Sequence, residues 1–507
     1  MRAVDPAYNA YPDTRRVDID IRFLLVDPDA AGNATATATE KIDAISDASQ
    51  ILDPDNAPTE KWATLEPGLW RLDGTWDILP DDATDIPIGL WTVVSGAQGG
   101  FLFPPPELVL TLSEPATSAG FELFFDDRAQ LWAATVVIKV YDSQNTLITS
   151  GTFFPTGPRF QAALPAENYS RVVMTFNGTP TGYRRVRLYS VLFGIGEYFT
   201  KSNTITATWS EGAALAAERF PARQIIFTFD NADHRYNFLN PTGLFGYLQD
   251  GQTIESSIII DGYAVDMGEY FFQTGTAKDS GLTAEITASD KSYWLDMEVY
   301  NNGTSGDWTV AEALADVLGE SWDFDGPSAV LETTIRTCIP MGTTKREAVR
   351  LIAQAAMCAV YVDRDGTLIL DTMGQGGTAV DTLDDDNMPS MDGISVGDRV
   401  DSVVLKVKDD FDSEDQGQEY TAGSGGVTWT VSNPLVAAVD GPTVAAWLLA
   451  QKQRYLKYKL QNRGNPAVEI GDTVTVENAF DVEADAVITG IELSFNGGLT
   501  ETTEATE

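Results

Sequence analysis

Short runs of alternating apolar and polar residues recur along this chain. Between residues 15 and 25, every second side chain from position 17 to position 23 is apolar, and most of the intervening ones are charged. This period of two predicts a half-buried β-strand. The chain has 507 residues, whereas a single hydrophobic core stops growing at roughly 250–300 residues. We therefore expect several domains, mainly β with α+β parts.

A block of strands in the N-terminal half differs from its flanks. Tryptophans crowd its beginning, and alternating runs separated by turn signals follow up to residue 193. Strands at this spacing predict an antiparallel, jelly-roll-like β-sandwich over residues 65–195. We interpret the sandwich as an insertion into a loop, where extra domains are tolerated. The insertion would divide an N-terminal β domain into residues 1–64 and residues 196–300.

Helical patterns begin only in the second half of the chain. Thr309 with Glu312, and Thr344 with Glu347, have the spacing of a capping box, and apolar stripes at helical spacing follow each pair. After the second stripe, two short apolar runs flank Gly366, as in a hairpin. Residues 301–375 are therefore predicted to form a small α+β domain. Residues 376–507 are predicted to form a C-terminal β-barrel-like domain with one helix at 440–460.

The charge balance restricts the classes of function. The chain carries 75 acidic and 33 basic residues, a formal net charge of -42. Because nucleic-acid affinity comes largely from Lys and Arg that neutralise phosphates, we do not expect DNA binding. No signal peptide or stretch of about 18–20 apolar residues is visible, so we expect synthesis in the cytoplasm. Cys338 and Cys358 are expected to be reduced, buried thiols.

Several stretches resemble the tail hub proteins of tailed bacteriophages, the tail-tip or baseplate hub proteins of siphophage type. They are FDNADHRYNFLNPTGLFGYLQDGQ (229–252), REAVRLIAQAAMCAVYVDRDGTLIL (346–370), SNPLV (432–436), and the C-terminal segments GNPAVEIGDTVTV and ELSFNGGLT. The chain is also similar, through these stretches, to the central baseplate hub of contractile tails. Residues 65–195 depart from this pattern and look like an inserted carbohydrate-binding module.

The resemblance implies an architecture and a role. It implies β-barrel hub domains at both ends of the hub and a homotrimeric ring that closes the tail tube, lined by acidic side chains past which DNA slides without specific binding. The implied partners are a distal tail protein, a tape-measure protein, and receptor-binding or spike proteins. The implied location is the tail tip of the virion. Neither enzymatic activity nor a cofactor is implied.

Aromatic residues of the sandwich are the candidate glycan-binding site, because aromatic faces stack on sugar rings. The candidates are Trp70, Trp76, Trp91, Trp132 and Tyr183. Polar partners would be Asp73, Asp126, Asp127 and Arg128. The alternative is that most of these aromatics fill the sandwich core. Similarly, Arg184, Arg185 and Arg187 either bind an anionic partner or pair with carboxylates.

Other chemistry is weakly supported. His234 is the only histidine, without a nucleophile motif beside it, and one histidine with two cysteines excludes a typical zinc site. Calcium is not excluded, although the acidic runs at 384–387 and 409–415 lack an EF-hand pattern and are interpreted as solvated loops. Two alternative functions remain open: a glycan-binding adhesin of the tail or the cell surface, and a tail-associated cell-wall hydrolase.

Overall fold

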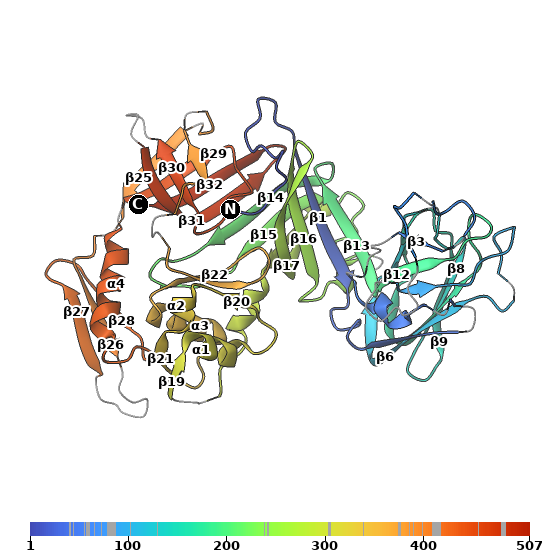
Figure 1. Cartoon of the computed structure of the whole chain (residues 1–507), viewed down its shortest axis with the longest axis horizontal. Coiled ribbons are helices and arrows are strands. Elements are labelled where there is room, and N and C mark those ends of the chain that lie inside the picture. Colours follow the sequence, from blue (N-terminus) through green and yellow to red (C-terminus); the bar gives the residue numbers. More distant parts are fainter. Residues whose placement is uncertain are drawn as a thin grey trace. The chain divides into compact units, whose positions relative to one another are not determined.

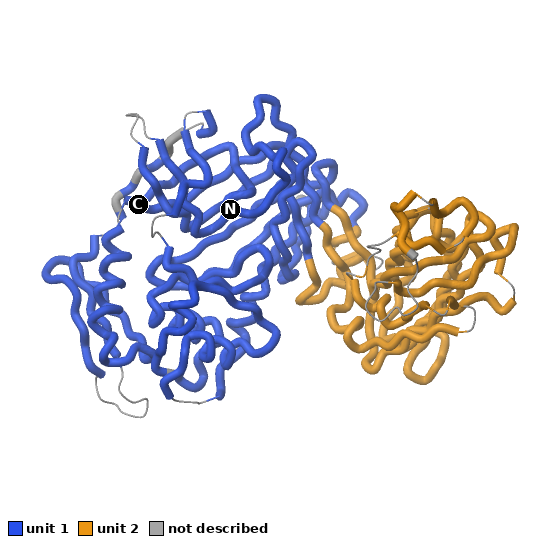
Figure 2. The backbone as a smooth tube through the Cα atoms, in the orientation of Figure 1, with its two compact units in different colours: residues 1–21, 199–234, 254–507 blue, residues 22–198, 235–253 orange. Residues whose placement is uncertain are grey.

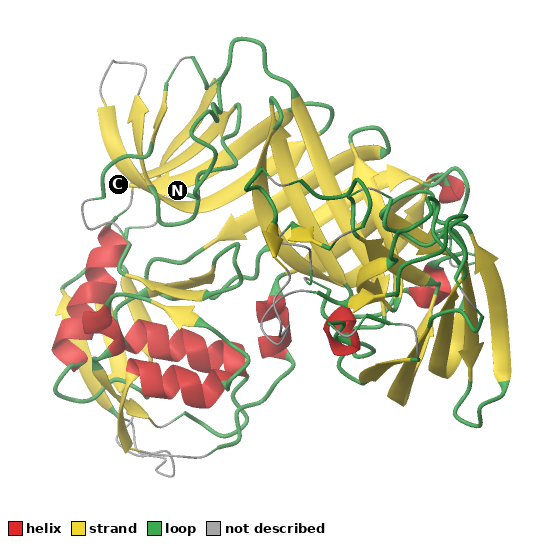
Figure 3. Ribbon diagram, turned by 45° about the vertical axis from the view of Figure 1, so that its right-hand side comes forward, coloured by secondary structure: helices red, strands yellow, loops and turns green. Residues whose placement is uncertain are grey.

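The computed structural model divides the chain into two compact units (Figure 2). The first unit comprises residues 1–21, 199–234 and 254–507, and the second comprises residues 22–198 and 235–253. The structure describes all residues except 40, 41, 44, 55, 57–60, 65, 72, 79–87, 102, 129, 238, 241–242, 303–305, 338, 374–376, 385, 389, 398, 408–416, 455 and 478–482. The prediction of a mainly β chain with α+β parts is confirmed, since strands dominate both units (Figure 3).

The strands β1 (Val17–Val26) and β13 (Gly194–Thr200) carry the chain into the second unit and back, and residues 235–253 return to that unit a second time. The second unit contains β2 (Ala34–Ala38), η1 (Ala48–Leu52), β3 (Trp62–Ala63), β4 (Asp77–Ile78), β5 (Leu90–Trp91), β6 (Glu107–Ser118), β7 (Phe121–Phe125), β8 (Val136–Tyr141), β9 (Leu147–Phe153), β10 (Arg159–Ala162), β11 (Ala166–Phe176), β12 (Arg187–Leu192) and η2 (Phe245–Tyr247).

The elements of the first unit continue in chain order. They are β14 (Thr204–Gly212), β15 (Gln224–Asp230), β16 (Thr253–Ile260), β17 (Tyr263–Lys278), η3 (Asp279–Gly281), β18 (Thr283–Ser289), η4 (Lys291–Asp296), β19 (Gly306–Thr309), α1 (Val310–Leu318), β20 (Phe324–Asp325), α2 (Ser328–Leu331), β21 (Thr334–Thr337), α3 (Lys345–Ala355), β22 (Ala359–Val362), β23 (Leu368–Asp371), β24 (Asp381–Leu383), β25 (Ser390–Val396), β26 (Ser402–Val407), β27 (Gln418–Gly423), β28 (Thr428–Ser432), α4 (Gly441–Gln453), β29 (Leu456–Asn462), β30 (Thr473–Glu477), β31 (Glu483–Phe495) and β32 (Leu499–Thr506).

A single large sheet joins the two ends of the chain. Its strand order is β13-β1-β16-β17-β18-β15-β14-β31-β32-β29-β25, and β30 pairs with β31 and β24. The antiparallel pair of β14 and β31 links the part predicted as the N-terminal β domain to the part predicted as the C-terminal one (Figure 1). The strands expected to form separate barrels therefore share one sheet, and the path through its described strands is open at β13 and β25.

The second unit is the predicted sandwich. One sheet has the order β2-β6-β11-β8-β9 and the other β10-β7-β12-β5. Alternation explains how they pack: Leu108, Leu110 and Leu112 of β6 point into a core that also contains Phe121 and Tyr169. The predicted boundary at residue 65 is wrong, because β2 pairs with β6 and the unit already begins at residue 22.

The α+β part begins with a capped helix. Thr309 and Glu312 form the complete capping box at the start of α1, as predicted. At α3 only half of the predicted box forms: the Thr344 side chain accepts from the Glu347 amide, whereas the Glu347 carboxylate binds Arg350 at 2.6 Å. The apolar stripe of α3 is buried, and β22 and β23 form the expected hairpin, with Gly366 at φ +80° in the turn.

The C-terminal helix is shorter than the predicted 440–460. α4 ends at Gln453, because Arg454 leaves the helical conformation and Leu456 begins β29, which pairs with β32. α4 packs on β26 and β27, which form a small sheet of their own with β28. Within the described parts of the chain, no helix is long and apolar enough to cross a membrane.

Two buried arginines attach the hairpin β22–β23 to the large sheet. Arg364, in the hairpin turn, binds Glu211 of β14 at 2.8 Å and also donates to the carbonyls of Pro466 and Val468. Arg223 donates to the carbonyl of Asp363. Burial alone would raise the pKa of Glu211, but the two guanidinium groups hold it below its ordinary value. The pair is therefore ionised and satisfied inside the fold.

We expect Arg364→Ala to destabilise the first unit by about 3–5 kcal/mol, because it leaves the Glu211 carboxylate buried without its partner. Replacing both members, as Glu211→Leu with Arg364→Met, should recover a large part of this loss. Urea unfolding monitored by tryptophan fluorescence measures both effects. Arg16→Ala, at an exposed ion pair with Asp18, is the control and should cost less than about 1 kcal/mol. Equal losses for the two single variants would contradict this assignment.

Candidate functional site

A buried charged cluster lies within the sandwich unit, and its members include residues next to the candidate glycan-binding segments. Its centre is Arg187 of β12, which binds Glu66 and Asp126, and whose side chain is 1% exposed. The guanidinium group lies over the ring of Trp91, 4.0 Å from the ring centroid. Asp126 in turn binds Arg128 at 2.7 Å. These ion pairs hold the Arg187 guanidinium group away from solvent, and its Nε is buried without a hydrogen-bond partner among the described residues.

Glu66 connects this cluster to the loop before β12. Its carboxylate accepts a hydrogen bond from the backbone amide of Arg185 at 2.9 Å, and the Arg185 side chain binds Asp43 at 2.8 Å. Burial opposes ionisation of Glu66, but Arg187 and the hydrogen bond from Thr64 lower its pKa below the ordinary value. Of the two interpretations of the arginines, pairing with carboxylates is the one observed for Arg185 and Arg187.

The five predicted aromatics occupy different environments. Trp91 is 0% exposed and covered by Arg187, so it cannot stack on a sugar, and its assignment to the glycan site is corrected. Trp132 packs against the sandwich core, as the core interpretation expects. Trp70 and Trp76 are half-buried, and Tyr183 is 51% exposed. Tyr183 is thus the most accessible of the set.

The backbone around Tyr183 is firmly held. Tyr183 has φ +58°, a region that bulky residues rarely adopt and that costs about 1–3 kcal/mol. Its amide donates to the carbonyl of Gly96 at 3.2 Å, and the next amide, that of Arg184, donates to the Ser95 hydroxyl. A Cβ on Gly182 would lie 2.2 Å from the carbonyl oxygen of Ala97. The close contact of these two loops therefore fixes the backbone from which the tyrosine ring projects.

Glu66 brings two of the candidate segments to one anchor. The Glu66 backbone carbonyl accepts a hydrogen bond from the Leu69 amide at 3.2 Å, in the turn that leads directly into Trp70. The Glu66 side-chain carboxylate accepts a hydrogen bond from the amide of Arg185, which follows Tyr183 in the segment that enters β12. Trp76 precedes β4, which pairs with β3 instead. Of the predicted polar partners, Asp73 and Asp127 are exposed, whereas Asp126 and Arg128 bind each other. Sequence patterning identified the aromatics but missed the anchoring role of Glu66.

A cavity of about 970 Å³ lies in the first unit. It is lined by the segment after β14, by the segment that leads into β26, by the end of α4 with the start of β29, and by β32. Six of the lining side chains are basic: Arg219, Arg399, Lys452, Arg454, Lys457 and Lys459. No sequence pattern marks these six residues, because they come from separate segments of an acidic chain.

The histidine and the cysteines, which catalysis or metal binding would use, lie in different settings. The His234 ring contacts the carbonyl of Gly281 at 3.2 Å. Cys358 is fully buried, and burial raises the pKa of its thiol to about 12, so it is not a thiolate near neutral pH. Cys338 and the run 409–415 lie outside the described residues. No cluster of three or more metal-ligating side chains occurs among the residues that could be searched.

We expect Glu66→Gln to destabilise the sandwich by about 3 kcal/mol or more at pH 7, because Arg187 loses a buried counter-charge. The pKa of Glu66 is lowered by folding, so its stabilisation is present above its ordinary pKa of 4.5 and is lost as the pH falls through the folded value. Calorimetry between pH 3 and pH 7 should therefore show a weaker pH dependence in Glu66→Gln. Glu114→Gln, at an exposed position on β6, is the control, and an unchanged acid response in Glu66→Gln would contradict the assignment.

Comparison with known proteins gives similarity at the level of structure. No protein-family model and no curated protein sequence matches the chain. Among solved structures, the tail protein from Neisseria meningitidis MC58 is similar over 61% of this chain and 94% of its own, with 14% identity and a TM-score of 0.45. The 43 kDa tail protein of prophage MuSo2 from Shewanella oneidensis matches over 61% of this chain and 93% of its own, with 14% identity and a TM-score of 0.44.

The family 32 carbohydrate-binding module of NanJ from C. perfringens, solved with galactose, matches over 35% of this chain and 99% of its own, with 12% identity and a TM-score of 0.22. The chain is thus similar to phage-type tail proteins and to a carbohydrate-binding module.

Proposed function

We propose that this chain is a structural, non-enzymatic component of a phage-type tail tip, with a hub part and an inserted module that binds glycans of the host surface. The observation that carries the proposal is the way the module is inserted. The chain leaves the large sheet through β1 and returns through β13, and these two strands are neighbours in that sheet. The sheet therefore stays continuous despite the insertion, as tolerated insertions require.

The hub part would work as an assembly of three copies around the tail axis. The chain as a whole carries a net charge of -42, and such a charge around the axis would repel the phosphates of passing DNA over about 8–10 Å at physiological salt. In this role the hub contacts a distal tail protein, a tape-measure protein, and receptor-binding or spike proteins. The protein would be synthesised in the host cytoplasm and located in the virion tail tip.

The sandwich would recognise a sugar through Tyr183, with Trp70 as a second aromatic surface. Tyr183 is exposed and its backbone is fixed by the loop contacts around Gly182, so little entropy is lost when a ligand binds. Stacking on a sugar face requires an accessible ring, which Trp91 lacks. The buried ion pairs beneath the loops keep these segments rigid, which is a positioning role and not a contact with the ligand.

We expect Tyr183→Ala to weaken glycan binding about tenfold, which corresponds to about 1.4 kcal/mol. Binding of the full-length protein to a glycan array, followed by titration of the strongest hit, measures the effect. Phe154→Ala removes an aromatic ring that is 65% exposed elsewhere on the same module and is the matched control. Equal binding by the wild type and Tyr183→Ala would contradict the assignment of this tyrosine, and absence of binding to any glycan would contradict the role of the module.

We expect the purified protein to form trimers, because a ring on the tail axis needs a closed symmetric contact. Light scattering coupled to size-exclusion chromatography measures the mass, and three times the 55.0 kDa of one chain is the expected value. A mass of one chain at all protein concentrations would count against the ring. This outcome would leave glycan binding untouched, so the two halves of the proposal can fail separately.

A further inference from the structure

The cavity of the first unit has the opposite charge balance to the chain. Six basic side chains line it against two acidic ones, Glu218 and Glu504, whereas the chain as a whole has more than twice as many acidic as basic residues. All lining residues belong to the first unit. Such a local reversal concentrates positive potential in a recess, where it is screened less than on an open surface.

The basic side chains of the cavity differ in whether a carboxylate of the chain already pairs with them. Arg399 is 83% exposed and binds Asp401, and Lys452 binds Glu218 while its ammonium group lies 4.5 Å from the centroid of the Trp429 ring. Lys459 lies 3.6 Å from Glu504, at the long end of an ion pair. Within the described part of the chain, Arg219 and Lys457 form no ion pair.

The lysines of β29 form an ordered row along one wall. Lys457 and Lys459 are exposed on one face of the strand, whereas Tyr458 and Leu460 point to the other. Thr506 and Glu504 of β32 lie directly opposite Lys457 and Lys459. The Cα atoms of Lys457 and Lys459 are therefore separated by two residues of strand, about 6.6–6.8 Å.

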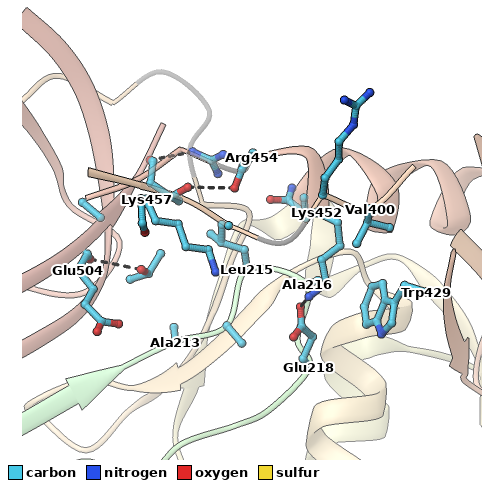
Figure 4. A pocket seen from close by; sticks show the side chains of 18 of the residues that line it. Ala213, Leu215, Ala216, Glu218, Val400, Trp429, Lys452, Arg454, Lys457 and Glu504 are labelled. Atoms are coloured by element: carbon cyan, nitrogen blue, oxygen red, sulfur yellow. Dashed lines mark hydrogen bonds and ion pairs between the residues drawn. The ribbon is translucent and has the colours of Figure 1, made fainter. Parts of the chain in front are cut away.

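The facing wall is pre-formed by contacts from α3. Arg350 and Gln354 donate to the carbonyls of Ala217 and Ala216 at 2.9 and 3.0 Å, and Arg346 donates to the carbonyl of Phe220. These bonds fix the segment after β14. Figure 4 shows this segment facing Lys457, with Leu215 beside the ammonium group and Trp429 farther along the same side of the cavity.

The arrangement selects among anionic ligands. A single phosphate requires donors that converge on one point, whereas these lysines are spaced along a strand and share the cavity with the apolar side chains of Leu215 and Trp429. An extended peptide repeats its side chains every second residue, at the same spacing as the lysines. A volume of about 970 Å³ lies at the upper end of the range for ligand pockets, which is enough for a short peptide segment.

We propose that this cavity binds an extended, acidic segment of a partner protein, whose alternate carboxylates pair with Lys457 and Lys459 while its apolar residues contact Leu215 and Trp429. We do not expect long nucleic acids to bind, because the chain as a whole carries a net charge of -42. The proposal does not depend on the tail function. It concerns a partner site on the first unit, whereas the glycan site is on the second.

The test uses the full-length protein and a fluorescent octapeptide of alternating glutamate and valine, with binding measured by fluorescence anisotropy. We expect saturable binding that weakens about tenfold or more in the double variant Lys457→Gln, Lys459→Gln, and that weakens as salt rises. Arg219→Gln, on the opposite wall, should also lower the affinity. Lys406→Gln, at an exposed lysine that pairs with Glu419, is the matched control and should bind like the wild type.

Further ligands separate the alternatives. A peptide of alternating lysine and valine should not bind, and inorganic tripolyphosphate should compete at least tenfold more weakly than the acidic peptide. Equal or stronger competition by tripolyphosphate would replace the peptide site with a general anion site and overturn the proposal. Unchanged peptide affinity in the double variant and in Arg219→Gln, with an unchanged circular dichroism spectrum, would also overturn it.

Discussion

The ion pair between Arg364 and Glu211 is the contact on which the organisation of the first unit depends. It joins a hairpin turn to the middle of the large sheet, and the same guanidinium group binds two carbonyls of the segment that precedes β30. Arg223 strengthens the junction, because it donates to the hairpin carbonyl of Asp363 and its guanidinium lies 5.0 Å from the ring centroid of Tyr270. Removing one charge would leave its partner in a medium of low polarity, so the junction is stable only when both members are present.

The sandwich also contains buried ion pairs, in which Arg187 lies between Glu66 and Asp126. Burying ion pairs changes the charge balance on the surface of an acid-rich chain. Each buried pair withdraws one acid and one base, and because the chain has 75 acids and 33 bases, the ratio of acids to bases among the remaining residues rises. A recess lined by Lys457, Lys459 and Arg219 therefore stands out electrostatically, and it differs in kind from the buried pairs because its cations are open to a ligand.

Local patterns predicted local structure well. The alternation before residue 25 gave β1, and the capping box of Thr309 and Glu312 formed at the start of α1. Sequence patterns did not predict the elements whose structure depends on residues distant in sequence. The Ala-Thr run of β2 has no strong apolar face, so only its pairing with β6 assigns it to the sandwich. Residues 48–52 form the short helix η1, which begins with a hydrogen bond from the Ser49 amide to the Asp47 side chain.

The candidate sites show the same limit. The sequence pointed to aromatics in the sandwich, but burial decided among them, since Trp91 lies under Arg187 and Tyr183 reaches solvent. Pairing with carboxylates was one of two interpretations of Arg185 and Arg187, and in the structure both bind Glu66. The basic cavity could not be predicted, because its walls come from segments separated by hundreds of residues, which contacts such as the pairing of β14 with β31 bring together.

A cryo-EM reconstruction of assembled particles that contain this chain tests the central claim most directly. The account predicts that the chain occupies the tip of a tail tube, in three copies around the axis, with acidic side chains facing the lumen and the sandwich at the periphery. A chain located away from the tube, or a single copy whose inner surface is neutral, would contradict it.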